Sequence, residues 1–134
     1  MIKQLSSEDI PIILVYKPDV SDIVNCTIGE WVQLLMRIVE NENFLLLGAY
    51  KEGALTGYIV LRNNISPPVA NNIRVIFAHL ENVENEDMHE IINAMINWAR
   101  SLGADFITAL CKKKNRYLDF GFIETGMVSV ERKI

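Results

Sequence analysis

The sequence predicts a mixed α/β (α+β) fold in which one twisted sheet of about six strands is covered by helices on both faces. Two β-prone runs near the middle, residues 44–50 and 54–61, are separated by a short glycine-containing turn and predict an antiparallel hairpin. Residues 73–111 have the pattern of a strand, a loop, a helix and a second strand. With the helical patterns on either side, the expected order is β-α-α-β-β-β-α-β-α-β.

The composition is that of a folded chain, with one domain expected over residues 1–134. Half of the 134 residues are apolar and 22% are charged, which is enough for a sizeable core. The net charge of −4 gives no electrostatic reason to expect nucleic acid or an anionic membrane as a partner. No apolar stretch approaches the roughly 20 residues that span a bilayer, and the N-terminal residues lack a signal-peptide core, so the expected location is cytoplasmic.

The two cysteines, Cys26 and Cys111, lie far apart and lack the spacing of a metal site. We expect both to be reduced thiols, with Cys111 a small core residue at a strand end. No metal site is expected.

The first third of the chain predicts a short strand and two helices. Residues 2–5 have the pattern of a strand, and residues 6–9 place a hydroxyl cap and acids at a helix start. That helix is expected to end before Pro18, because the residue preceding a proline is disfavoured in helical geometry. Thr27 and Glu30 form a capping box that begins the second helix. The buried stripe of this second helix is expected to consist of Trp31, Leu34, Leu35, Ile38 and Val39. The alternative for Trp31 is that it lines a ligand pocket.

The remaining elements follow from glycine, proline and apolar spacing. Gly57, inside the second hairpin strand, predicts a bulge or a close backbone approach. A loop rich in proline and asparagine precedes the strand at 73–80, and the long helix after it ends at Gly103. A strand, a basic run, a short helix and a closing strand are then expected over residues 106–111, 112–116, 117–120 and 127–132. Two interpretations of the basic run remain open: it binds an anion, or it is a solvent-exposed strand end.

The loop before the long helix is where such a unit often binds an anion. Here it contains no glycine, arginine or glutamine and carries Glu81, Glu84, Glu86 and Asp87 instead. A phosphate cradle needs successive N–H groups turned one way, with torsions that glycine adopts cheaply. One carboxylate about 4 Å from a phosphate charge costs roughly 1 kcal/mol in bulk water, which offsets the similar attraction of an exposed helix N-terminus. For Glu86 and Asp87 we therefore expect a structural role at the helix start.

Four stretches, in their order and spacing, resemble the GNAT superfamily of acyl-CoA-dependent N-acyltransferases. They are similar to the family's first strand and helix entry, its central hairpin, the helix that runs into its fifth strand, and the Y-x-x-x-G-F close of its last helix. In this sequence they are residues 1–11, 48–59, 98–107 and 117–122. Together they span nearly the full chain, so the resemblance implies a GNAT-like fold.

The resemblance also implies a site between the family's fourth and fifth strands, which splay apart and hold the pantetheine arm of acetyl-CoA or another acyl-CoA. The residues along that arm would be Phe77, Ala78, His79 and Leu80. The family's pyrophosphate loop, R/Q-x-x-G-x-G/A, is missing here, so the chain resembles a divergent member. The candidate cofactor contacts at the corresponding helix start are Asn85, Glu86, Asp87 and Met88, with Asn115 from the basic run.

Two residues are candidates for catalysis. Tyr117 matches the family's tyrosine, which is often the general acid that protonates the departing thiolate; its alternative role is a ring packed under the last strand. An amine acceptor must lose a proton, so a base near neutral pKa is needed. The family often has a glutamate on its fourth strand, where this chain has only His79, with Glu81 just past the strand end. An imidazole is chemically able to act as such a base, but a lone histidine at a strand end also suits a structural role.

Two functions remain open from the sequence. The first is a divergent GNAT-type N-acyltransferase that moves an acyl group from acyl-CoA to an amine of a small molecule or protein. The alternative is a degenerate module in which the fold persists for binding or assembly without CoA turnover; a small-molecule sensor is more remote. Because GNAT relatives are commonly dimers, a homodimer is one expected state. Short, glycine-poor chains of this kind also resemble phage-borne members.

Overall fold

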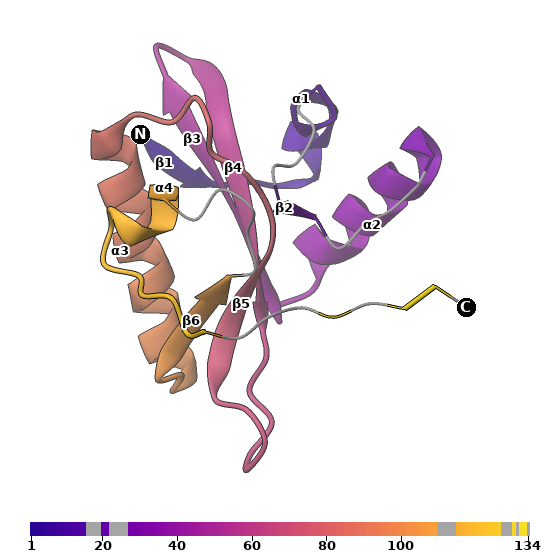
Figure 1. The fold of residues 1–134 in the computed structure, drawn as a ribbon. Coiled ribbons are helices and arrows are strands. Elements are labelled where there is room, and N and C mark those ends of the chain that lie inside the picture. Colours follow the sequence, from indigo (N-terminus) through magenta and orange to yellow (C-terminus); the bar gives the residue numbers. More distant parts are fainter. Residues whose placement is uncertain (16–19, 22–26, 110–114, 127–129, 131, 134) are drawn as a thin grey trace.

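A computed structural model describes residues 1–15, 20–21, 27–109, 115–126, 130 and 132–133 (Figure 1). The described elements combine six strands with helices between and after them, so the predicted mixed fold is confirmed. In chain order they are β1 (Ile2–Gln4), a 3₁₀ turn (Ser7–Asp9), α1 (Ile10–Ile13), β2 (Val20–Ser21), α2 (Ile28–Glu40), β3 (Phe44–Lys51), β4 (Ala54–Asn63), β5 (Asn72–His79), α3 (Asn85–Leu102), β6 (Phe106–Ala109) and α4 (Asn115–Leu118).

The described strands form one sheet with helices on both faces. Its order is β1-β3-β4-β5, and the far edge of β5 is shared by β6 and β2. The β5–β6 pair is parallel and the other pairs are antiparallel. Figure 1 shows α1 and α2 on one side of the sheet and α3 and α4 on the other. No helix in the described part of the chain combines the length and apolar character that a membrane crossing needs.

Each face of the sheet has its own apolar cluster. Alternation along β4 sends Ile59 and Leu61 into the cluster under α3, and Tyr58 and Val60 into the cluster under α2. The helices contribute matching stripes from their inward faces. The buried residues of those stripes are Leu35 and Ile38 from α2, and Met88, Ile91, Met95 and Ala99 from α3. We call these clusters the α2-face cluster and the α3-face cluster.

The helix starts agree with the predictions, but the first helix is shorter than expected. Thr27 Oγ1 accepts a hydrogen bond from the Glu30 amide at 3.2 Å, which confirms the capping box of α2. The end expected for the first helix, just before Pro18, is wrong, because α1 ends at Ile13. There the Val15 amide donates to the Ile12 carbonyl in a tighter turn, and the exposed Val15 side chain has no packing that would extend the helix.

The central hairpin matches its prediction closely. Its turn residues, Glu52 and Gly53, have φ values of 52° and 79°, the left-handed pair that a two-residue hairpin turn needs. The β3–β4 register shifts beside Gly57 so that Thr56 is an extra residue. The Thr56 hydroxyl donates to the Ala49 carbonyl at 3.2 Å. The bulge predicted near Gly57 is therefore confirmed.

Two features at the ends of the fold differ from expectation. The strand β2 lies between the first two helices and was not predicted, because two residues carry no periodicity. The short helix α4 covers Asn115–Leu118, earlier than predicted, and a turn with Gly121 at φ 92° follows it. The expected closing strand at 127–132 lies largely outside the described residues. So do both cysteines and most of the basic run.

Candidate functional site

The site is built around an extra residue in the middle of β5. The register between β4 and β5 shifts there, which leaves Ile76 as the bulged residue. A bulge changes the side-chain alternation of a strand. Consequently Ile76 and Phe77, although consecutive, both lie in the α2-face cluster, whereas Val75 and Ala78 lie in the α3-face cluster.

The bulge also marks the point where β5 changes its neighbour. The parallel ladder with β6 runs from Asn72 to Val75 and ends at the pair Val75–Ala109. Just beyond the bulge, Phe77 and Ala78 pair instead with the two residues of β2. The far edge of β5 is therefore divided between a parallel partner before Ile76 and an antiparallel partner after it.

After β5 the chain passes very close to the backbone of β4. A Cβ atom built on Gly57 would lie 2.3 Å from the His79 carbonyl oxygen and 2.4 Å from Val83 Cγ2. These contacts are far shorter than van der Waals separation. Gly57 therefore lets the loop between β5 and α3 lie directly on the hairpin, and the predicted close approach is confirmed.

Gly57→Ala is expected to lower the free energy of unfolding by about 1–3 kcal/mol, because backbone atoms cannot move aside as a flexible side chain can. Urea unfolding measures the change. The matched control is Gly29→Ala, where the nearest atom to an added Cβ is 3.9 Å away and alanine favours the helix. Equal stabilities of the two variants would contradict the close approach.

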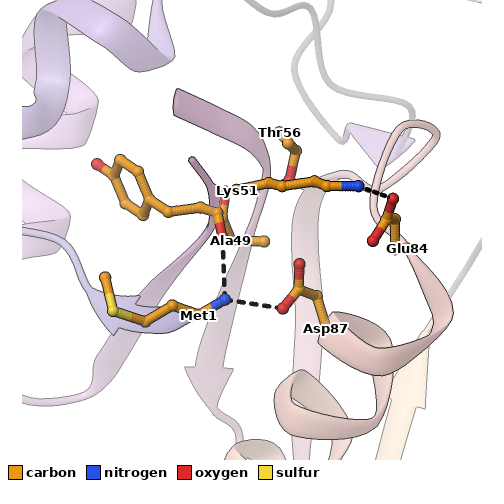
Figure 2. Close-up of polar contacts among 7 residues, drawn as sticks. Met1, Ala49, Lys51, Thr56, Glu84 and Asp87 are labelled. Atoms are coloured by element: carbon orange, nitrogen blue, oxygen red, sulfur yellow. Dashed lines mark hydrogen bonds and ion pairs between the residues drawn. The ribbon is translucent and has the colours of Figure 1, made fainter. Parts of the chain in front are cut away.

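Two cations reach the acids at the start of α3 (Figure 2). The α-amino group of Met1 donates to Asp87 Oδ1 at 2.8 Å and to the Tyr50 carbonyl at 2.9 Å. The Lys51 ammonium pairs with Glu84. Asp87 is only 8% exposed, and a buried carboxylate needs such a partner. Two acids of this loop are thus neutralised by the first strand and the hairpin.

These pairs refine the structural role expected for the acids. Glu84 is the N-cap residue of α3, but its side chain makes no capping hydrogen bond. Asp87 accepts a hydrogen bond from the Met1 amino group, so it joins α3 to the start of the first strand. Glu86 is exposed in the first helical turn, where a negative charge complements the helix dipole.

Both cations have raised pKa values. The pKa of the Met1 amino group lies above its ordinary 8.0, chiefly because of the hydrogen bond to Asp87. The pKa of Lys51 lies above its ordinary 10.5, chiefly because of the hydrogen bond to Glu84. A group whose pKa is raised by folding stabilises the folded state below its unfolded pKa and loses that contribution as the pH rises through its folded pKa.

The Met1–Asp87 pair should therefore make stability depend on pH on the alkaline side. We expect the stability difference between the unchanged protein and Asp87→Asn to be full below about pH 8 and to narrow as the pH rises through the raised pKa of the Met1 amino group. Urea unfolding of both proteins across this range is the measurement. A difference that stays constant would show that the amino group and Asp87 are not coupled.

The two candidate catalytic residues lie on opposite faces of the sheet. Tyr117, from α4, is 5% exposed and belongs to the α3-face cluster, with its ring edge-to-face with Phe122 at 5.3 Å. His79, at the end of β5, stacks on Tyr58 of the α2-face cluster at 6.3 Å. Both the Tyr117 hydroxyl and His79 Nε2 are buried. The structure does not bring the two side chains into one cluster.

The candidate cofactor contacts divide in the same way. Phe77 lies on the α2 face, edge-to-face with the partly buried Trp31 at 5.3 Å, so Trp31 packs against the α2-face cluster. Ala78 and Leu80 are buried in the α3-face cluster. Met88 is fully buried in that cluster, which leaves its side chain no access to a surface ligand.

The remaining candidates are at the beginnings of two helices. Asn85 and Glu86 are exposed at the start of α3. Asn115 is the first residue of α4, and its side chain lies outside the described part. Ile76, Lys51 and Met1 could not be assigned to this region from the sequence, because a bulge and two long-range ion pairs leave no local pattern.

Solved structures share this arrangement of strands and helices. The aminoglycoside acetyltransferase AAC(6')-Iy, in complex with a bisubstrate analog, CoA-S-monomethyl-acetylneamine, is similar over 100% of this chain and 97% of its own, with a TM-score of 0.75 and 12% identity. A GNAT family acetyltransferase from Staphylococcus aureus is similar over 99% and 98%, with a TM-score of 0.67 and 14% identity. The chain has the GNAT fold.

A third GNAT-fold neighbour is a predicted acetyltransferase from Clostridium acetobutylicum, solved with acetyl-CoA. It is similar over 98% of this chain and 95% of its own, with a TM-score of 0.73 and 13% identity. No protein-family model matches the sequence, and no curated protein matches it. The fold expected from the four matching stretches is therefore confirmed by similarity of structure at low sequence identity.

Proposed function

We propose that this chain is an acyl-CoA-dependent N-acyltransferase of GNAT type that moves an acetyl or other acyl group to an amine. The observation that carries the proposal is the change of partner on the β5 edge at Ile76. The GNAT fold, with neighbours solved with acetyl-CoA or a CoA analog, supports an acyl-CoA beside this edge. By the resemblance, the pantetheine arm would lie along residues 77–80.

A ligand at this position would contact both faces of the sheet. It would have Tyr117 on the α3 face and His79 on the α2 face. In the reaction the amine nitrogen attacks the thioester carbon and the carbon–sulfur bond breaks. His79 takes the proton from the amine, and Tyr117 gives a proton to the departing sulfur. Residues on opposite faces can thus act on the two sides of one acyl group.

The diphosphate of CoA fits the start of α3 less well. The loop has no glycine, and together with Glu84 and Asp87 it carries Glu81 and Glu86. Repulsion of about 1 kcal/mol per nearby carboxylate offsets the attraction of the helix N-terminus. We therefore expect the affinity to come mainly from the acyl-pantetheine part of the ligand.

Binding of acetyl-CoA tests the function. At ten times its Kd, acetyl-CoA adds about 1.4 kcal/mol to stability and should raise the melting temperature by roughly 3–6 °C. No shift at millimolar acetyl-CoA would reject the transferase and favour the binding or assembly module.

Comparison with a shorter ligand tests the weak diphosphate contact. S-acetylpantetheine, which lacks the nucleotide and diphosphate, should bind within about tenfold of acetyl-CoA, a difference of about 1.4 kcal/mol at most. Calorimetry with both ligands measures it. An acetyl-CoA affinity more than about 100-fold higher would show that the start of α3 does hold the diphosphate.

A further inference from the structure

The strand β2 occupies part of the β5 edge along which the acyl-CoA is proposed to lie. Val20 pairs with Ala78 and Ser21 with Phe77. On their other side, the same two β5 residues pair with Ile59 and Val60 of β4. Beyond the bulge, the backbone of β5 is therefore paired on both edges by the chain itself.

A pairing as short as that between β2 and β5 can be replaced by another extended chain. Backbone N–H and C=O groups at a strand edge require partners, and another extended chain with amide groups can supply them. A contact of only two residues is marginal beside a full hairpin. The pantetheine arm of acyl-CoA is an extended chain with two amide groups, so it has the chemistry to replace β2 on this edge.

We propose that β2 is an internal competitor for the β5 edge and that acyl-CoA displaces Val20–Ser21 from Phe77–Ala78 when it binds. This inference rests on the proposed function, because the acyl-CoA supplies the displacing chain. The observed affinity is then the intrinsic affinity reduced by the fraction of molecules whose edge is uncovered. Weakening β2 should raise the affinity for acetyl-CoA without any new contact to the ligand.

The test is a pair of double variants. Val20→Pro with Ser21→Pro removes the backbone N–H groups of β2, so it cannot donate to the ladder. Both positions are changed because antiparallel pairs alternate between hydrogen-bonded and non-hydrogen-bonded. The matched control, Val20→Ala with Ser21→Ala, keeps both N–H groups. Calorimetry should give the proline variant a Kd for acetyl-CoA roughly three- to tenfold lower, and the alanine variant a Kd within about twofold of the unchanged protein.

Hydrogen exchange of the unchanged protein provides a second measurement that does not depend on the folding of any variant. The amides of residues 20–21 should exchange faster once acetyl-CoA is bound, because they leave the ladder. Persistent protection of these amides in the bound state, or equal affinities of the proline and alanine variants, would overturn the competition and leave the transferase intact.

The remaining outcomes separate the inference from the function. If only the proline variant binds acetyl-CoA, β2 blocks the acyl-CoA site in the unchanged protein, and both the competition and the site are supported. If neither the unchanged protein nor either variant binds acetyl-CoA at millimolar concentration, both the competition and the proposed function are rejected.

Discussion

Tyr117→Phe is expected to lower the turnover number for acyl transfer by at least about 100-fold, the usual scale of a general acid. The substitution removes the proton donor but keeps the ring that packs on Phe122 and in the α3-face cluster. The fold and the affinity for acetyl-CoA should therefore change little. Release of CoA thiol in the presence of a polyamine, an aminoglycoside or a lysine peptide measures the turnover.

The control for this substitution is Tyr50→Phe, which also removes a phenolic hydroxyl. The Tyr50 hydroxyl lies 3.4 Å from Asp9 Oδ1, near the 3₁₀ turn after the first strand, so its loss should leave turnover within about twofold. If the two variants retain the same turnover, Tyr117 does not protonate the thiolate, and its ring has only the packing role.

Deletion of Ile76 is expected to raise the Kd for acetyl-CoA by at least about tenfold. Without the extra residue, Val75, Phe77 and Ala78 alternate regularly and keep their present faces. The ladder between β5 and β6 can then continue past its present end. A longer β6 ladder would then take the place of the two-residue β2 on the edge that the acyl-CoA is proposed to use.

The control for the deletion is Ile76→Ala, which removes the buried side chain and keeps the bulge. It should cost about 2–5 kcal/mol of stability, as for other large-to-small core changes, while its folded form binds acetyl-CoA with an unchanged Kd. Thermal unfolding and calorimetry on both variants separate the two effects. A deletion variant that binds as well as Ile76→Ala would show that the bulge does not create the site.

Elements governed by local signals could be predicted from the sequence. The Thr27–Glu30 capping box, the hairpin turn at Gly53 and the end of α3 at Gly103 each depend on residues within one or two turns. Gly103 has φ 77°, the left-handed conformation typical of a glycine that ends a helix. The strand β2 depends instead on its pairing with the distant strand β5, and no nearby residue indicates it.

The site could be predicted only in outline. The order of elements brings the end of β5 and the start of α3 together, as expected. The faces occupied by Phe77, His79 and Tyr117 follow from the bulge at Ile76 and from where α4 packs, and neither leaves a periodic pattern. The partner of Asp87 lies 86 residues away in the sequence, so its ion pair with Met1 could not be predicted from a local pattern either.

The close approach at Gly57 has a mechanical consequence. With no side chain between them, β4 and the loop before α3 lie in direct contact, and the Lys51–Glu84 pair links them further. We expect this side of the fold to rearrange little when a ligand binds. If acyl-CoA displaces β2 as proposed, ligand recognition would combine one preformed side with one that rearranges.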